Sequence, residues 1–292
     1  MKIILFSRIQ IAHVAEELLL IFDAIHHFGF DYAVNDTFAP ILERLIGRSI
    51  PPKKRYSQKS QLPTADAVMI CYGGDGTLLE GIRCLHGAEI PVIGINSGHL
   101  GFLTSTPKEG IAQVFEQIAA GEIKIESRTM LDVRGDFDCL PESPYAVNEV
   151  SIQRNGAGMI SIETFVDDQM VATYHGDGLI LCTPTGSTAY SLSAGGPVVA
   201  PACACFVLSP LAPHNLTMRP VVIPDSSIIT LKVHTRRGGA SLTLDNSTYA
   251  IGEGAIFTVR RSERRIFLAV PHNISFYDTL RNKMMWGVDI RG

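Results

Sequence analysis

The sequence predicts an α/β plus all-β protein, with an N-terminal Rossmann-like α/β domain and a C-terminal β-sandwich-like domain. Its 292 residues correspond to about two domains at roughly 150 residues each. Up to about residue 125, short apolar runs alternate with helical patterns, which is typical of a parallel sheet. Beyond that point, short β-branched and aromatic runs separated by turns are typical of a sandwich. We expect domains at 1–125 and 126–275, with a helix at about 276–292 that packs back on the first.

The elements of the first domain follow from their apolar periodicity. Ile3 to Phe6 are typical of a strand, and apolar residues from Ile11 and Val14 to Ile25 share one face of a helix. The prolines and charges of residues 51–59 predict a solvated loop, and the alternative is that this segment approaches a phosphate. Further on, we expect buried strands at 67–72 and 90–95 and helices at 78–85 and 111–119.

The second domain is predicted from runs rich in β-branched and aromatic residues. A polar pair interrupts an apolar strand at 146–150, and the run 178–182 is apolar throughout. Further strands are expected at 160–166, 228–233, 241–244 and 266–270.

Composition and charge exclude several classes of protein. The net charge is −4, which argues against a basic nucleic-acid surface, and 46% hydrophobic with 18% charged residues excludes disorder over the whole length. Residues 178–218 carry no Asp, Glu, Lys or Arg, but five prolines exclude a membrane-spanning helix. The N-terminus lacks a signal-peptide pattern, and the six cysteines are scattered. We expect a cytoplasmic protein with reduced thiols, no membrane contact and no nucleic-acid partner.

The turn at residues 73–77 (Gly-Gly-Asp-Gly-Thr) is the first candidate site. Glycines let backbone N–H groups approach a phosphate, and the start of the next helix adds a partial positive charge. A carboxylate beside phosphates is repelled unless it binds a hydroxyl or a metal, so Asp75 is predicted to be a base for phosphoryl transfer. The alternative is that Asp75 caps the helix. Neither a P-loop motif nor a Gly-x-Gly-x-x-Gly fingerprint occurs in the sequence.

Three further segments place polar residues at strand ends. Residues 94–103 join a buried strand to a glycine-rich turn, where Phe102 either stacks on a base or packs in the core. Asn148 and Glu149 offer acceptors suited to both hydroxyls of a ribose. Residues 177–193 form a charge-free strand and a hydroxyl-rich turn, followed by a short helix beginning near Thr188. Such a turn either binds ribose, adenine or phosphate, or is an elaborate helix cap.

Taken together and in this order, the four segments closely resemble the NAD kinase family, in particular its compact bacterial members. The resemblance runs from about residue 65 to 193 and continues more weakly to the end. Diacylglycerol kinases share the Gly-Gly-Asp-Gly-Thr turn, but the stretch 183–197 (Thr-Pro-Thr-Gly-Ser-Thr-Ala-Tyr-Ser-Leu-Ser-Ala-Gly-Gly-Pro) is highly specific.

The resemblance implies transfer of the γ-phosphoryl group of ATP to the 2′-hydroxyl of the adenosine ribose of NAD, giving NADP. Substrate is then expected between the two domains, with a divalent cation such as Mg²⁺ and a homodimer or homotetramer; no residue is assigned to the metal. Asp75 matches the general base, and the phosphate-binding residues are Gly73, Gly74, Gly76 and Thr77. The implied NAD contacts are Asp75, Gly76, Phe102, Asn148, Glu149, His175, Asp177, Thr188, Ala189, Tyr190, Ser191, Leu192 and Ser193.

Two positions depart from the family's pattern. His175 stands where many members carry Arg, so a titratable group takes that place. Residues 245–247 are Asp-Asn-Ser where the family often has Asp-Gly-Gln, which puts any contact from this loop in doubt.

Three rival interpretations stay open at this point. A lipid kinase of the diacylglycerol type shares the turn, although the net charge disfavours a basic membrane-facing patch. An NAD-binding sensor without turnover would keep the pocket, but the carboxylate of Asp75 disfavours it. The third interpretation takes the glycine turns as tight connections only.

Overall fold

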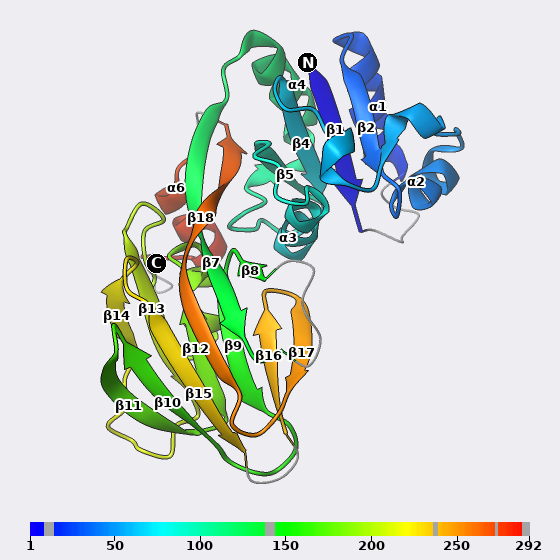
Figure 1. Ribbon diagram of the computed structural model, residues 1–292. Coiled ribbons are helices and arrows are strands. Elements are labelled where there is room, and N and C mark those ends of the chain that lie inside the picture. The colour runs from blue at the N-terminus through cyan, green and yellow to red at the C-terminus, as the bar shows by residue number, and fades with distance from the viewer. Residues whose placement is uncertain (9–14, 138–143, 236–238, 272–273, 288–292) are drawn as a thin grey trace. The chain divides into compact units, whose positions relative to one another are not determined.

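The computed structural model describes residues 1–8, 15–137, 144–235, 239–271 and 274–287 (Figure 1). The chain divides into two compact units. Unit 1 comprises Met1–Ser127 and Ile266–Gly292, and unit 2 comprises Arg128–Arg265. Ile11 and Val14 of the first predicted helix, residues 288–292 of the last predicted helix, and Cys139, one of the six cysteines, lie outside the described residues.

Unit 1 is built on a parallel sheet in the order β5-β4-β1-β2-β3, and β6 pairs with β5. Its strands are connected mainly through helices, because parallel neighbours need a long crossover connection, and such crossovers are right-handed. The elements are β1 (Lys2–Ser7), α1 (Ala15–His27), β2 (Asp31–Asn35), α2 (Ala39–Ile46), β3 (Arg55–Tyr56), β4 (Ala67–Tyr72), α3 (Asp75–Cys84), β5 (Val92–Asn96), β6 (Thr106–Pro107), α4 (Ile111–Ala120) and α6 (Phe276–Met284).

Burial explains why these elements form. Five of the six residues of β4 are buried, as expected for a strand covered on both faces. Helix α1 buries an apolar stripe of Leu18, Ile21, Phe22 and Ile25 at helical spacing.

The prediction of a solvated loop at residues 51–59 is right for residues 51–53 and 57–59, which are exposed, but wrong for the short strand between them. Two short 3₁₀ turns, Pro52–Lys54 and Lys59–Gln61, flank strand β3 there, and the Tyr56 ring is fully buried. Arg55 donates to the Glu43 carboxylate at 2.7 Å. Sequence reasoning gave weight to the prolines and lysines, whereas one aromatic side chain and one ion pair fix the segment to the sheet.

Unit 2 is a β-sandwich. One sheet is antiparallel in the order β14-β13-β12-β9-β16-β17, and β11-β10-β15-β18 form the other layer with β7 paired to β18. The bounds are β7 (Lys124–Gly135), β8 (Tyr145–Ala146), β9 (Glu149–Arg154), β10 (Ile160–Val166), β11 (Gln169–Gly176), β12 (Gly178–Cys182), β13 (Cys205–Leu211), β14 (Val221–Pro224), β15 (Ile229–Thr235), β16 (Ala240–Leu244), β17 (Ser247–Ile251) and β18 (Ile256–Val270), with the short helix α5 (Tyr190–Ser193) after β12.

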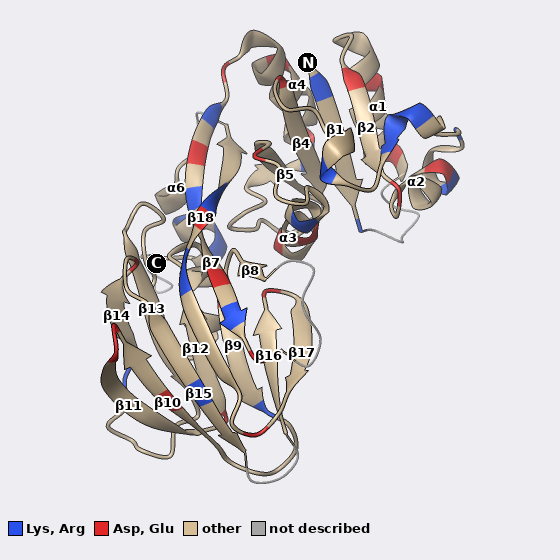
Figure 2. Ribbon diagram, in the orientation of Figure 1, with Lys and Arg blue, Asp and Glu red and all other residues tan. Residues whose placement is uncertain are grey.

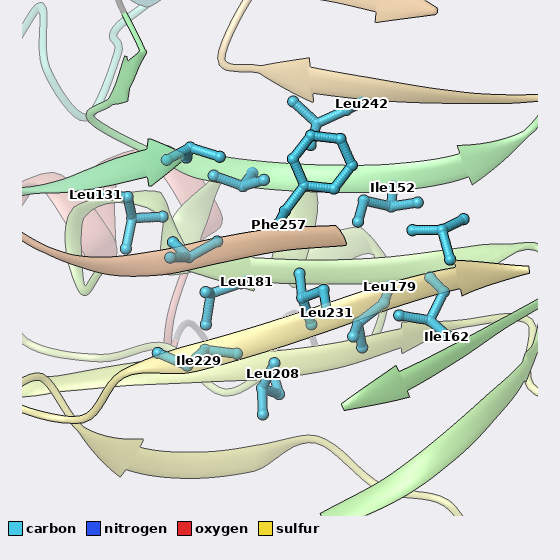
Figure 3. Packing of buried hydrophobic residues seen from close by; sticks show 14 of the residues in the cluster. Leu131, Ile152, Ile162, Leu179, Leu181, Leu208, Ile229, Leu231, Leu242 and Phe257 are labelled. Carbon is cyan, nitrogen blue, oxygen red and sulfur yellow. The ribbon is translucent and has the colours of Figure 1, made fainter. Parts of the chain in front are cut away.

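Alternating side chains from both layers form one hydrophobic core. In β15 and β16 every second residue is buried, which directs one face of each strand inward. Figure 3 shows Leu181, Leu231 and Phe257 among the side chains that fill the space between the strands. The predicted fold class, a mixed α/β domain followed by a largely β domain, is confirmed.

Several predicted element bounds need correction. The strand expected at 266–270 is the end of the 15-residue strand β18. The strand expected at 146–150 is broken, because β8 ends at Ala146 and β9 begins at Glu149. After β12 the chain forms a 3₁₀ turn at Thr185–Thr188, and α5 begins at Tyr190 rather than near Thr188.

Charged residues of both signs follow each other along β7 and β18 (Figure 2). Arg134 and Arg260 approach the buried carboxylate of Asp132 at 2.9 and 3.3 Å. Among the described residues no helix is long and apolar enough to cross a membrane. The described cysteines, Cys71, Cys84, Cys182, Cys203 and Cys205, are free thiols.

Candidate active site

Asp75 of unit 1 lies where strand β4 turns into helix α3. It is the first residue of α3, and Gly74 precedes it in an extended conformation. The helix has no side-chain cap, so the alternative in which Asp75 serves as the cap is wrong. Around it, Gly73 and Thr77 are buried, Gly76 is half-buried and Gly74 is exposed.

The Asp75 carboxylate accepts four hydrogen bonds from the turn that follows β5. Backbone N–H groups of Leu103 and Thr104 donate to Oδ1 at 3.0 and 2.9 Å, and the Thr104 hydroxyl donates to the same oxygen at 2.9 Å. The Phe102 N–H donates to Oδ2 at 2.9 Å. The carboxylate is therefore fixed in direction, with three donors on one oxygen and one on the other.

Gly101 makes this approach possible. A Cβ atom at this position would lie 1.9 Å from Asp75 Oδ1 and 2.2 Å from Thr104 Oγ1. Because such a distance is far below van der Waals contact, any other residue would displace the carboxylate or the turn. The glycine-rich segment that sequence analysis singled out thus serves to bring backbone donors against Asp75.

A cation from the other end of the chain completes this cluster. Lys283 Nζ, on α6, lies 3.8 Å from Asp75 Oδ2 and 4.9 Å from the centre of the Phe102 ring. Phe276 of the same helix contacts Phe102 with ring centres 6.3 Å apart. Phe102 is therefore half-buried rather than a core residue, and its ring contacts two side chains of α6, while its stacking on a base stays a prediction.

Asn148 and Glu149 of unit 2 lie at the bend between β8 and β9. The Asp245 carboxylate, at the turn between β16 and β17, accepts the N–H groups of Val147, Asn148 and Glu149 at 2.8, 2.8 and 3.2 Å. Although residues 245–247 depart from the family's pattern, their aspartate makes contacts that hold the Asn-Glu pair.

Glu149 has an unusual carboxyl group. Its Oε2 atom is buried and has no hydrogen-bond partner among the described residues. Burial first, and the charge of Asp245 second, raise the pKa of Glu149 to about 8, although an N–H of Tyr190 acts in the opposite direction. This carboxyl group is therefore largely protonated at neutral pH and can donate as well as accept a hydrogen bond.

The hydroxyl-rich turn after β12 packs directly on this bend. The Thr183 hydroxyl donates to the Val147 carbonyl at 2.6 Å, and the Thr183 N–H donates to the Asn148 carbonyl at 2.9 Å. A Cβ at Gly186 would lie 2.1 Å from that Asn148 carbonyl. Two segments that sequence analysis treated separately thus form a single cluster in unit 2.

The remaining predicted NAD contacts differ in exposure. Asp177 accepts a hydrogen bond from Arg154 Nε at 2.6 Å, and the exposed Tyr190 donates to Gln153 at 3.3 Å. Ser191 is fully buried, and its hydroxyl contacts that of Ser209 at 2.9 Å. His175 and Ser193 are exposed, whereas Thr188, Ala189 and Leu192 are half-buried.

Sequence reasoning missed several residues of these clusters as contacts, among them Thr104, Arg154, Asp245 and Lys283. Thr104 closes the glycine-rich segment and could have been included with it. Lys283 carries no local signal, since its neighbours in sequence are ordinary residues of an exposed helix. The described residues contain no group of three or more His, Cys, Asp or Glu side chains placed to hold a metal ion.

Comparison with known proteins identifies the family. Residues 35–123 match the sequence profile of the ATP-NAD kinase N-terminal domain, and residues 147–271 match that of the ATP-NAD kinase C-terminal domain. The chain belongs to the NAD kinase family. The match covers both units, which favours this family over the diacylglycerol kinase interpretation.

The chain is also similar to individual NAD kinases of bacteria. It is 36% identical to the NAD kinase of Bacteroides fragilis over 292 residues, which is 100% of both chains. It is 40% identical to the NAD kinase of Porphyromonas gingivalis over 233 residues, covering 79% of this chain and 80% of the relative.

Solved structures share the fold at lower identity. Yeast NADH kinase complexed with NADH has a TM-score of 0.86 at 22% identity, covering 99% of this chain and 89% of the relative. An NAD kinase from Archaeoglobus fulgidus in complex with ATP has a TM-score of 0.75 at 24% identity, covering 98% and 99%. These two similarities establish the fold.

Proposed function

We propose that this NAD kinase family member transfers the γ-phosphoryl group of ATP to the 2′-hydroxyl of the adenosine ribose of NAD, giving NADP, with Asp75 as general base. The observation that carries the role of Asp75 is its carboxylate, held by four donors at the start of α3. The choice of substrates is supported by the relatives, of which one was solved with NADH and another with ATP.

The two carboxylate oxygens of Asp75 have different roles in this proposal. Oδ1 accepts three hydrogen bonds, whereas Oδ2 accepts one, from the Phe102 N–H. A carboxylate oxygen has two lone pairs, so Oδ2 retains acceptor capacity for a hydroxyl. The ribose 2′-hydroxyl donates its proton to Oδ2 as its oxygen bonds to the γ-phosphorus and the bond to the β-phosphate oxygen of ATP breaks.

Most of the catalysis is then positioning. Phosphoryl transfer needs the hydroxyl in line with the γ-phosphorus and the negative charge on the phosphoryl oxygens neutralised. Gly73, Gly74, Gly76 and Thr77 of the turn at 73–77 are our candidates for phosphate contacts. The N–H groups of Gly73 and Thr77 already donate to the carbonyls of Ile95 and Gly74 at 2.8 and 2.9 Å, so a backbone contact from these two requires the turn to rearrange. Mg²⁺ is bound in many kinase sites chiefly by the donor's phosphates, so we treat it as part of the donor, Mg–ATP.

The clusters of unit 2 are proposed to hold NAD. Asn148 offers an amide and Glu149 a largely protonated carboxyl group, which together supply donors and acceptors for ribose hydroxyls. The further proposed contacts are Gly76, Phe102, His175, Asp177, Thr188, Ala189, Tyr190, Ser191, Leu192 and Ser193. For Phe102 and Ser191 the contact would have to come from backbone or from a rearranged side chain, because both side chains have partners within the chain.

The test is NADP formation from NAD and Mg–ATP by the wild type and by Asp75→Asn. Loss of the base is expected to lower the rate by roughly 10²–10⁴-fold. Asp23→Asn is the matched control, since Asp23 is an exposed aspartate of α1 in the same unit. Melting curves and NAD affinity check that Asp75→Asn is folded.

Two results would change the proposal in different ways. A folded Asp75→Asn protein with the wild-type rate excludes Asp75 as the base. If the wild type binds NAD but forms no NADP with ATP, another nucleoside triphosphate or polyphosphate, the protein is an NAD-binding sensor.

A further inference from the structure

Helix α6 carries a cation to the carboxylate that the proposed function makes the general base. The helix begins with a capping box in which Ser275 and Asp278 exchange hydrogen bonds. Phe276 and Lys283 are seven residues apart, so they lie on one face of the helix, and both contact the Phe102 ring. Lys283 Nζ is thereby held 3.8 Å from Asp75 Oδ2.

This ammonium group is not required to satisfy Asp75. The carboxylate already accepts four hydrogen bonds, and a distance of 3.8 Å is too long for a fifth. Within the described parts of the chain, Lys283 donates no hydrogen bond. Asp278, the acid on the same helix, pairs with Arg281. The ammonium group is therefore positioned by a cation–π contact with the Phe102 ring and by attraction to the Asp75 carboxylate, and its three N–H donors stay available for another anion.

The geometry of phosphoryl transfer indicates which anion this is. A hydroxyl bound to Asp75 Oδ2 lies about 2.7 Å from that oxygen, and the attacked phosphorus lies about 3–3.5 Å further on, so the γ-phosphorus is within about 6 Å of Oδ2. Lys283 Nζ is 3.8 Å from the same oxygen and ends a flexible stem. We propose that Lys283 binds the γ-phosphoryl oxygens of the donor and neutralises their charge during transfer.

This role rests on the proposed function, because Asp75 marks the position of the attacking hydroxyl. In the balanced step, the hydroxyl proton passes to Asp75, the new bond joins the ribose oxygen to the γ-phosphorus, and ADP leaves with the electron pair of the broken bond. Lys283 keeps its three protons throughout and contacts the oxygens that carry the charge.

The experiment compares ATP with ADP, since only ATP has the γ-phosphoryl group. Lys283→Met keeps an apolar stem over Phe102 but removes the charge. It is expected to weaken ATP binding by about 10- to 100-fold, to weaken ADP binding several times less, and to lower kcat/KM for ATP at least in proportion. Lys283→Arg, which keeps the positive charge, should restore part of the ATP affinity and part of kcat/KM. Arg281→Gln, which changes a neighbouring cation paired within α6, is the control and should leave both affinities unchanged.

Repeating the binding measurement in the Asp75→Asn background separates this role from a merely structural one. If Lys283 binds phosphate, adding Lys283→Met to Asp75→Asn again weakens ATP more than ADP. If Lys283 only positions Asp75, ATP affinity is the same with and without Lys283→Met in that background, and the proposal is overturned. A wild-type reaction rate in Asp75→Asn would exclude Asp75 as the general base. The difference between ATP and ADP affinity in the Lys283 variants would still test whether Lys283 binds the γ-phosphoryl group.

Discussion

The two units each present a carboxyl group beside a turn, and they treat it in opposite ways. In unit 1, Asp75 receives four hydrogen-bond donors and a nearby ammonium group. In unit 2, three backbone N–H groups go to Asp245, while Glu149 next to it has a buried oxygen without a partner. The N–H donors of unit 2 thus go to the supporting carboxylate of Asp245. Glu149, half-buried beside it, is left as an acid that is largely uncharged at neutral pH.

This difference shows how the environment gives the same functional group two roles. A carboxylate fixed by donors on one side, with acceptor capacity on the other, is suited to accept a proton from a positioned hydroxyl. A carboxyl group whose pKa is raised to about 8 is suited to donate a hydrogen bond to an uncharged ligand at neutral pH.

Gly101→Ala tests how closely the turn must approach Asp75, and it has the largest expected effect. The added Cβ would lie 1.9 Å from Oδ1, so either the carboxylate or the turn must move. We expect kcat to fall by about 100-fold, since misplacement of a reacting group by about 1 Å costs that much. Steady-state kinetics with both substrates measures it.

Gly98→Ala is the matched control in the same turn. Its Cβ would have no neighbour within 4 Å, and its backbone is not in the left-handed region. A fall in kcat as large as that of Gly101→Ala would mean that the turn tolerates no substitution at all, and the specific role of the Asp75 contact would be lost.

Glu149→Gln tests the other side of the contrast through stability. The pKa of Glu149 is raised from 4.5 to about 8 in the folded protein, so the folded state retains a proton that the unfolded chain releases. The resulting stabilisation is fully present below pH 4.5 and is lost as the pH rises through 8. Gln mimics the protonated form, so relative to wild type the variant should gain about 4 kcal/mol between pH 5 and pH 9, at about 1.4 kcal/mol for each pH unit between the two pKa values.

Denaturant unfolding at a series of pH values measures this gain. Asp245→Asn sharpens the test because it removes the neighbouring charge that helps to raise the pKa of Glu149, so the upper end of the pH window should move down. A difference between wild type and Glu149→Gln that is the same at pH 5 and pH 9 would rule out a raised pKa at this position.

Local sequence signals were sufficient to predict the strand, the turn and the helix that carry Asp75. The strand at 67–72 was predicted with its observed bounds, since a continuous apolar run that follows Asp66 and ends at a pair of glycines has few other interpretations. The glycine turn that follows it was also predicted, but the helix expected at 78–85 begins three residues earlier, at Asp75, so Asp75, Gly76 and Thr77 belong to the helix. The Asn148 bend was missed as a bend, because an apolar run interrupted by polar residues also fits a continuous strand.

What sequence reasoning could not supply were contacts set by the tertiary fold. Asp75 and Lys283 meet only because β18 and α6 return to unit 1 at the end of the chain. Likewise, the pKa of Glu149 depends on Asp245, from a hairpin almost a hundred positions later. Such pairs leave no trace in periodicity or composition, so residues of this kind have to be found in the structure.

Thr104→Val has the smallest expected effect. It measures how much the third hydrogen bond to Asp75 Oδ1 contributes to kcat. Valine keeps the shape and the backbone N–H but removes the hydroxyl that donates to Oδ1 at 2.9 Å. Because Oδ1 retains two backbone donors, we expect kcat to fall only about 3- to 10-fold, the value of about one hydrogen bond, with KM for ATP and NAD unchanged. Thr104→Ser retains the hydroxyl and should keep kcat near the wild-type value. A loss as large as that of Asp75→Asn would show instead that the threonine hydroxyl, not the backbone of the turn, fixes the carboxylate.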